Sequence, residues 1–236
     1  KTWTTRGAFC NWVFGLFRTD PEAARHSGMT YLMVPLDASG VTVRGVERLD
    51  GDEGFAEVFF DDVFVADDLV LGDVNEGWGV AMATASSERG LTLRSPGRFC
   101  AAADRLVDLW KRQAAAGEHP ERIDSLRSDV AQSWMEAEAY RLATLADVTG
   151  LVKGVSQGAR SSLTKIYWSE LDVKLNETAL RLLGPAAELI ETSAGAVDGG
   201  VWMKGFEFAL SGPIYAGTNE IQRNVVAERV LGLPRK

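Results

Sequence analysis

Apolar and polar positions follow two different periods along the chain, and the change comes near residue 72. Up to that point, short segments rich in Val, Phe, Tyr and Thr are separated by Gly, Pro, Asp and Ser, which is typical of strands joined by turns. With no helical period between them, these segments predict an antiparallel, barrel-like β domain over residues 1–72. The segments are "NWVFGLFRT", "MTYLMVPLD", "GVTVRGVERL" and "FAEVFFDDVFV".

Beyond "LGDVNEGWG" the apolar residues recur every three or four positions, as they do on one face of a helix. Pro96 is expected to bend the first of these helices. Long helices with short connections predict a four-helix bundle, so we expect an α+β protein whose helical domain covers residues 73–236. The expected helices cover residues 76–116, 121–149, 156–184, 199–210 and 218–231.

Composition narrows the class of protein. The 236 residues are 46% hydrophobic and 25% charged, which is ordinary for a globular chain, and the net charge of −8 argues against nucleic acid as a partner. No apolar run reaches the ~18 residues of a membrane-spanning helix. Cys10 and Cys100 lie far apart, as expected of two reduced thiols in a cytoplasmic protein. Because the sequence opens at Lys1 within a pattern, we expect it to be part of a longer chain.

The sequence lacks the residues that two common kinds of active site need, those of a serine hydrolase and those of a metal centre. The segment "GVSQG" matches the G-x-S-x-G of a serine hydrolase, but a helical segment precedes it where that turn needs a strand. Both histidines, His26 and His119, lie before the serine, whereas that fold places its histidine after it. Two histidines and two scattered cysteines also predict no metal site.

One acidic residue interrupts an apolar helical face. Trp78, Ala81, Ala85, Glu88 and Thr92 are spaced by three and four residues, so they share one side of the first expected helix. An acid at such a position either pairs with a neighbouring helix or is a general base whose pKa is raised by burial. Both alternatives are compatible with the spacing.

Four segments in order resemble the acyl-CoA dehydrogenase family. They are the opening "KTWTTRG", the segment "AEVFFDDVFVADDLVLG", the helix with "SERG" and the closing "GPIYAGTNEIQRNVVAERVLGLPRK". The similarity covers the whole chain as the family's middle β domain and C-terminal helical domain. The resemblance implies that the family's N-terminal helical domain lies before Lys1 and is missing here.

The resemblance implies a flavin site that uses FAD. Trp3 and Thr5 match the positions that flank the flavin ring, and the residues from Tyr215 onward match a turn that approaches flavin and thioester. The implied cofactor-binding residues are Trp3, Thr5, Tyr215, Thr218 and Glu220, and the implied substrate-binding residues are Arg89, Ala216 and Gly217.

The resemblance also implies which residue is the catalytic base. Many members carry a glutamate where this chain has Ala216, whereas isovaleryl- and long-chain-type members place it before an arginine on the long helix, as Glu88 precedes Arg89. Glu88 would take the α-proton of an acyl-CoA thioester while hydride passes from the β-carbon to flavin N5. The implied product is a trans-2-enoyl-CoA, as in β-oxidation, and an electron-transfer flavoprotein would accept the electrons.

Two segments depart from the family pattern. Most members follow the first bundle helix with an arginine and a phenylalanine–glycine pair that hold a neighbouring subunit's FAD, but this chain has "KRQAAAGEHPERIDSLRS". Arg181 and Pro185 likewise replace a glutamine and a glycine. We therefore expect a homo- or hetero-oligomer, with a hetero-tetramer favoured, in which a related partner completes the FAD site. The alternatives are an acyl-CoA oxidase on the same fold and a non-catalytic partner subunit.

Overall fold

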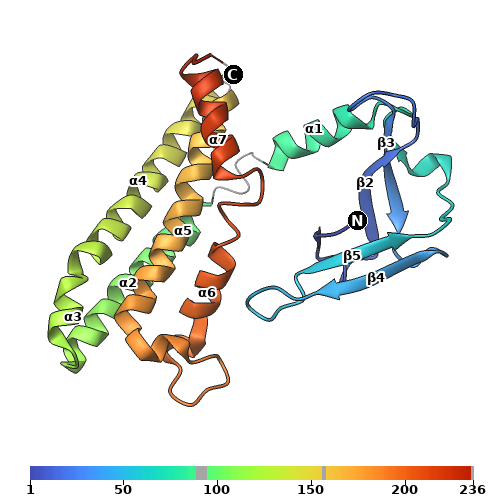
Figure 1. The fold of residues 1–236 in the computed structure, drawn as a ribbon. Helices are drawn as coiled ribbons and strands as arrows, with labels where there is room; N and C mark the ends of the chain where they lie inside the picture. Colours follow the sequence, from blue (N-terminus) through green and yellow to red (C-terminus); the bar gives the residue numbers. More distant parts are fainter. Residues whose placement is uncertain (89–94, 156–157, 235–236) are drawn as a thin grey trace. The chain divides into compact units, whose positions relative to one another are not determined.

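The computed structural model describes residues 1–88, 95–155 and 158–234, with the backbone alone for residues 85–88. Its internal contacts divide the chain into two compact units, residues 1–88 and 89–236. All of the described strands belong to the first unit, and the long helices belong to the second (Figure 1). One helix, α1, goes with the strands, although we expected it to open the helical domain.

The strands form two separate antiparallel sheets of three strands each, in the orders β1-β5-β4 and β2-β3-β6. No pairing joins the two sheets among the described residues, so our expectation of a barrel was wrong. One edge strand of each sheet, β1 in the first and β6 in the second, is only two residues long. The bounds are β1 Thr4–Thr5, β2 Trp12–Arg18, β3 Met29–Pro35, β4 Val41–Val46, β5 Phe55–Phe60 and β6 Val70–Leu71, with a short 3-10 helix at Asp67–Leu69.

The core of this unit comes from alternate positions of the strands. Ala56 and Val58 of β5 are fully buried, while the next residue, Phe59, is 45% exposed. On the second sheet, Val13 and Val34 are buried and directly opposite each other in the β2–β3 register. This period of two is the one that the sequence pattern predicted for these segments.

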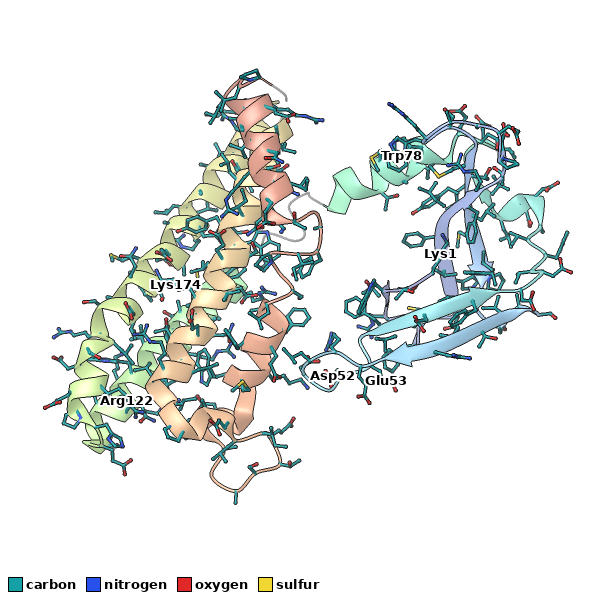
Figure 2. All side chains as sticks on the ribbon, in the orientation of Figure 1. Lys1, Asp52, Glu53, Trp78, Arg122 and Lys174 are labelled. Atoms are coloured by element: carbon teal, nitrogen blue, oxygen red, sulfur yellow. The ribbon has the colours of Figure 1, made fainter. Side chains whose placement is uncertain are left out.

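Helix α1, Gly77–Glu88, starts against the backbone of β3. A Cβ atom on Gly77 would lie 2.4 Å from the backbone nitrogen of Tyr31, so only glycine allows this approach. The Asn75 N–H donates to the Thr30 hydroxyl over 2.9 Å, and the Trp78 indole stacks on His26 with ring centroids 3.9 Å apart (Figure 2). These contacts fix the first turn of α1 on the sheet.

The helices of the second unit begin and end largely where the sequence predicted, with two differences. Pro96 is the first residue of α2, where its fixed φ starts a helix, whereas we expected it to bend one. Pro120 starts a separate short helix, α3, so the segment expected at 121–149 is divided in two. The bounds are α2 Pro96–Ala116, α3 Pro120–Ser125, α4 Arg127–Val152, α5 Ser161–Leu183, α6 Val201–Ala209 and α7 Asn219–Val225. Short 3-10 helices lie at Gly158–Arg160, Gly184–Glu188 and Val197–Gly200, and a π-helical turn, Val226–Val230, extends α7.

Three long helices pack around one apolar core. Phe99 of α2 meets the Tyr140 ring of α4 edge-on at 5.2 Å, and Trp168 of α5 lies at 6.4 Å from Phe99. An ion pair of 2.7 Å between Lys174 of α5 and Glu136 of α4 joins the same helices at the surface (Figure 2). The other fully buried core residues include Ala103, Leu106, Leu109, Leu175, Ala179 and Leu182.

The fourth member of the expected bundle is broken. Both α6 and α7 pack against α5, one after the other, and the segment 210–218 between them is a non-helical turn (Figure 1). The break brings the backbone of this turn to the side of α5, and the turn contains four of the residues that the sequence singled out, Tyr215, Ala216, Gly217 and Thr218.

Two surface properties complete the description. Cys10 is exposed and Cys100 is half-buried, and neither forms a disulfide. Within the described ranges, every helix is too short or too polar to cross a lipid bilayer.

Candidate active site

The first group of candidate residues is Thr5, on β1, and Trp3, directly before this strand, which pairs with β5. The Trp3 indole is 66% exposed and meets the Phe55 ring edge-on at 5.7 Å. Thr5, opposite Phe55 in the strand register, is exposed too, and its hydroxyl makes no hydrogen bond to a described residue. Trp3 has a φ of +61°, a conformation that costs a non-glycine residue roughly 1 kcal/mol or more. An exposed indole held in a strained backbone is more typical of a binding surface than of a core.

The segment that carries Trp3 is firmly attached to the sheet. The backbone nitrogen of Lys1 donates to the Val58 carbonyl over 2.6 Å, and Lys1 Nζ donates to the Leu16 carbonyl over 2.7 Å. The Arg6 N–H donates to the Gly54 carbonyl over 2.9 Å. The strand is therefore fixed on both sides of Trp3, while the indole itself stays open.

The second group lies in the turn between α6 and α7. Tyr215, 38% exposed, has its ring 5.8 Å from Trp168 of α5. Burial raises the pKa of the Tyr215 hydroxyl, the Arg98 guanidinium opposes this, and the Asp172 carboxylate adds to it. Tyr215 therefore stays a neutral phenol beside an ion pair between Arg98 and Asp172.

The next two residues have left-handed backbone conformations. Ala216 has a φ of +53° and Gly217 one of +86°. Glycine adopts this region without strain, whereas alanine does so at a cost. Thr218 then caps α7, since its hydroxyl accepts a hydrogen bond from the Ile221 N–H at 3.3 Å.

Glu220, in the first turn of α7, is exposed. Its own backbone N–H and the Thr218 hydroxyl hydrogen-bond to the charged carboxylate and lower its pKa. Glu220 is therefore an exposed anion on the surface of the helical unit.

The structure also shows a set of buried polar side chains beneath the turn, which the sequence analysis did not predict. Asn219 and Gln222 of α7 are 2% and 1% exposed, and Lys165 of α5 is 6% exposed. Lys165 Nζ donates to Asn219 Oδ1 over 2.7 Å, and Gln222 Nε2 donates to the Ala216 carbonyl over 3.0 Å. The signal was present in "TNEIQR", where two amides three residues apart share one helical face.

The two remaining candidates fall outside what the structure describes. Glu88 is the last residue of α1, and its side chain is not among the described groups; Arg89 lies wholly outside the described residues. The described part of the predicted apolar stripe, Trp78 and Ala81, is half-buried within the first unit. The structure thus groups Trp3 with Thr5 and groups Tyr215 through Glu220, each within its own unit.

Comparison with known proteins identifies the family. A family model described as the C-terminal domain of acyl-CoA dehydrogenase matches residues 75–231. This chain belongs to the acyl-CoA dehydrogenase family. The resemblance to this family is thereby confirmed.

Curated relatives of this acyl-CoA dehydrogenase family chain include two proteins of the same name. Acyl-CoA dehydrogenase IpdE1 of Mycolicibacterium smegmatis is 38% identical over 237 residues, a match to 100% of this chain and 57% of the relative. IpdE1 of Mycobacterium tuberculosis is 37% identical, with 100% of this chain and 59% of the relative covered. The chain thus spans less than two thirds of the length of these relatives.

Solved structures of the family have the same fold. The ChsE4–ChsE5 complex from Mycobacterium tuberculosis superposes with a TM-score of 0.83 at 27% identity, over 99% of this chain and 60% of that chain. The Tcur3481–Tcur3483 steroid acyl-CoA dehydrogenase has a TM-score of 0.82 at 26% identity, over 99% of this chain and 59% of that chain. Both are named for two components.

Proposed function

We propose that this chain is part of an FAD-dependent acyl-CoA dehydrogenase that converts an acyl-CoA thioester to a trans-2-enoyl-CoA. The observation that carries the proposal is the turn at Tyr215–Thr218, a strained backbone beside α5 in a chain whose helical part matches the family model. FAD, when bound, supplies the acceptor for the hydride that leaves the β-carbon. The residues of this chain bind the thioester, orient it and take the α-proton.

The residues of the first unit fit a flavin. A planar, partly polar ring system needs an apolar surface and a nearby hydrogen-bond donor. The exposed Trp3 indole offers the first, and the exposed Thr5 hydroxyl, which is not bonded to a described residue, offers the second two positions along the chain. Tyr215, Thr218 and Glu220 would hold the cofactor from the second unit, as the family resemblance implies.

The thioester needs polarisation before a carboxylate can take its α-proton. Fixed hydrogen-bond donors aimed at the carbonyl oxygen stabilise the negative charge that develops there, and one such donor is typically responsible for about 100- to 1,000-fold in rate. We assign this role to the backbone N–H of Ala216, with Gly217 and Arg89 contacting the substrate.

Glu88 is the proposed base. In the turn itself the small Ala216 carries no carboxylate, so the base must come from another element, and Glu88 at the end of α1 is the acid that the sequence pattern singles out. The proton that Glu88 takes and the hydride that leaves the β-carbon together account for the two hydrogens lost from the acyl chain.

We further propose that the working enzyme contains a related partner subunit. The two components in the names of both solved relatives support this. Arg181, at a position that serves a neighbour's cofactor in the family, instead forms a 2.7 Å ion pair with Asp129 of α4. That arginine is thus engaged within its own subunit. An electron-transfer flavoprotein is the proposed electron acceptor.

The test uses the full-length protein, expressed alone and with related subunits encoded beside it. A panel of straight-chain, branched and steroid-side-chain acyl-CoAs is added anaerobically, and bleaching of the flavin absorbance is followed. Glu88→Gln should keep the flavin but slow bleaching by about 100- to 10,000-fold, because a general base is lost. Glu177→Gln, an exposed acid on α5, is the matched control.

Four outcomes decide the proposal. Bleaching by at least one acyl-CoA that disappears in Glu88→Gln supports it. Tight acyl-CoA binding without bleaching identifies a non-catalytic subunit, and rapid oxygen consumption during turnover identifies an oxidase. Full flavin content in the protein expressed alone removes the need for a partner.

A further inference from the structure

Gln222 joins the second turn of α7 to the turn that precedes this helix. Its carboxamide is buried, with the whole residue 1% exposed. The Nε2 group donates to the carbonyl oxygens of Ala216 at 3.0 Å and Gly217 at 3.4 Å. The Oε1 atom is buried and accepts no hydrogen bond from a described residue. The donor group of this amide is therefore engaged by two successive carbonyls of one turn.

These two bonds fix the direction of the N–H groups in the turn. In a trans peptide the C=O and N–H bonds point in opposite directions, and the described peptides are all trans. Because the carbonyls of Ala216 and Gly217 point towards Gln222, the N–H groups of Gly217 and Thr218 point away from it. The carbonyl of Ala216 is held by Gln222, and the φ angle of +53° then sets the direction of the Ala216 N–H relative to this fixed carbonyl.

The N–H groups of this turn are left open. No described residue accepts a hydrogen bond from the backbone nitrogen of Ala216, Gly217 or Thr218, whereas Tyr215 before them donates to the Ser211 carbonyl over 3.0 Å and Asn219 after them donates to the Pro213 carbonyl over 2.9 Å. The Gln222 amide thus binds the carbonyls on the inner side of the turn, and no described residue accepts from the backbone N–H groups of the turn.

The turn needs such a constraint, because its conformation is not the one that alanine prefers. In the left-handed region the Cβ of alanine crowds the following carbonyl oxygen, so Ala216 needs surrounding contacts to stay there. Asn219, fixed to Lys165 and Ser169 of α5, holds the start of α7. Gln222 is the side chain that transmits this fixed helix position to the carbonyls of the turn.

We propose that Gln222 is a positioning residue, which holds the Ala216–Thr218 backbone so that the Ala216 N–H is aimed at the thioester carbonyl. The inference rests on the proposed function, since it assigns the donor that Gln222 orients to the substrate carbonyl. Gln222 acts through the turn and touches neither substrate nor flavin.

The test replaces Gln222 by methionine in the full-length holoprotein. Methionine matches the length of glutamine and removes both the donor and the unpaired Oε1, so the core stays filled. The probe is the trans-2-enoyl-CoA product of whichever acyl-CoA the wild-type protein oxidises, labelled with ¹³C at the thioester carbonyl. Infrared difference spectra report how strongly the protein polarises that carbonyl.

We expect Gln222→Met to lose most of the shift of the carbonyl band to lower frequency and to lower kcat about 10- to 100-fold, with KM changed less than about threefold. Gln132→Met, a change of an exposed glutamine on α4, should leave both unchanged. Gln222→Asn keeps an amide one methylene shorter and should fall between wild type and Gln222→Met, which preserves the test should the methionine variant fold poorly.

The outcomes separate the two proposals. If the wild-type protein oxidises an acyl-CoA and both Gln222 variants polarise the carbonyl as strongly as it does, the positioning role is overturned while the dehydrogenase function stands. If the wild-type protein oxidises none of the panel, the proposed function fails and the positioning role fails with it.

Discussion

The ammonium group of Lys165 donates to the side-chain oxygen of Asn219 over 2.7 Å, and this bond joins the first half of α5 to the first residue of α7. Asn219 also exchanges hydrogen bonds with Ser169 and donates to Glu170. Burial lowers the pKa of Lys165, against the opposing effects of Glu220 and Glu170. An amide thus satisfies a buried ammonium directly beneath the turn that carries the proposed donors.

Lys165→Met is expected to destabilise the helical unit. A hydrogen bond to a charged group contributes about 1.5–3 kcal/mol, and part of this loss is offset because the ammonium no longer has to be buried. We expect a net fall of about 1 kcal/mol in the free energy of unfolding, measured by denaturant titration. Lys111→Met, which removes an exposed lysine with a 3.5 Å surface ion pair, is the control and should change little. Equal stability of the two variants would show that the buried bond contributes nothing net.

Gly77→Ala is expected to displace α1 from the first sheet. The new Cβ would lie 2.4 Å from the Tyr31 nitrogen and 2.6 Å from the Thr30 carbonyl carbon, and backbone atoms in a sheet cannot give way. We expect the free energy of unfolding of the first unit to fall by several kcal/mol, on the order of an overpacked core position or more. Turnover should fall as well, since α1 ends at the proposed base.

Gly79→Ala is the matched control for that substitution. It lies two residues along the same helix, and a Cβ there would meet no atom within 4 Å. Replacing a glycine inside a helix by alanine stabilises by roughly 0.5–1 kcal/mol. Opposite signs of the two changes in the thermal midpoint are therefore expected. A stable, fully active Gly77→Ala variant would contradict the close approach of α1 to β3.

Much of the fold could be predicted from periodicity alone. The four apolar segments before residue 72 contain β2 to β5, and the expected helical segments contain α2, α5, α6 and α7. The segment expected at 121–149 overlaps α3 and α4, which together run from Pro120 to Val152. The attachment of α1 to β3 could not be predicted, because it depends on a close backbone contact at Gly77 that leaves no periodic signal. The barrel was wrong because closure depends on which strands pair with one another, and the spacing of apolar segments along the chain does not reveal that pairing.

For the candidate site, the sequence predicted the turn residues but not the buried polar residues that support them. The closing segment "YAGTNEIQR" predicted a turn followed by a helix start, and the structure has Tyr215 through Glu220 together in the turn before α7 and its first residues. The polar residues that support the turn were missed because lysine and glutamine are ordinarily surface residues. Lys165 nevertheless shares an apolar stripe with Trp168, Leu171 and Leu175, and a lysine in such a stripe indicates a buried polar contact.

Trp3→Ala is expected to weaken flavin binding while leaving the fold intact. The indole is 66% exposed, so its loss removes little buried area beyond the edge-on contact with Phe55, worth about 0.5–1.5 kcal/mol. We expect FAD content, measured by absorbance per subunit in the full-length protein, to fall clearly. Phe64→Ala removes a ring that is 86% exposed and should retain wild-type FAD content. Unchanged flavin in the Trp3 variant would argue against its place beside the ring.

The stability of the helical unit should depend on pH through Asp172. Burial raises the pKa of this carboxyl above its ordinary value of 3.8, and the Arg98 guanidinium opposes the rise without cancelling it. Between 3.8 and the raised value, the folded state holds a proton that the unfolded state has lost. Asp172 therefore adds stability as pH falls through its folded-state pKa, and the gain levels off below 3.8.

The measurement compares the free energy of unfolding of the wild-type protein and Asp172→Asn from pH 7 down to about pH 4, with a single proton limiting the slope to about 1.4 kcal/mol per pH unit. The difference, wild type minus variant, should rise as pH falls. Asp124→Asn, a change at an exposed carboxyl on α3, is the control for loss of one negative charge. A difference that instead falls as the solution is acidified would mean that the Arg98 ion pair outweighs burial, so that the pair stabilises the ionised carboxylate beside Tyr215.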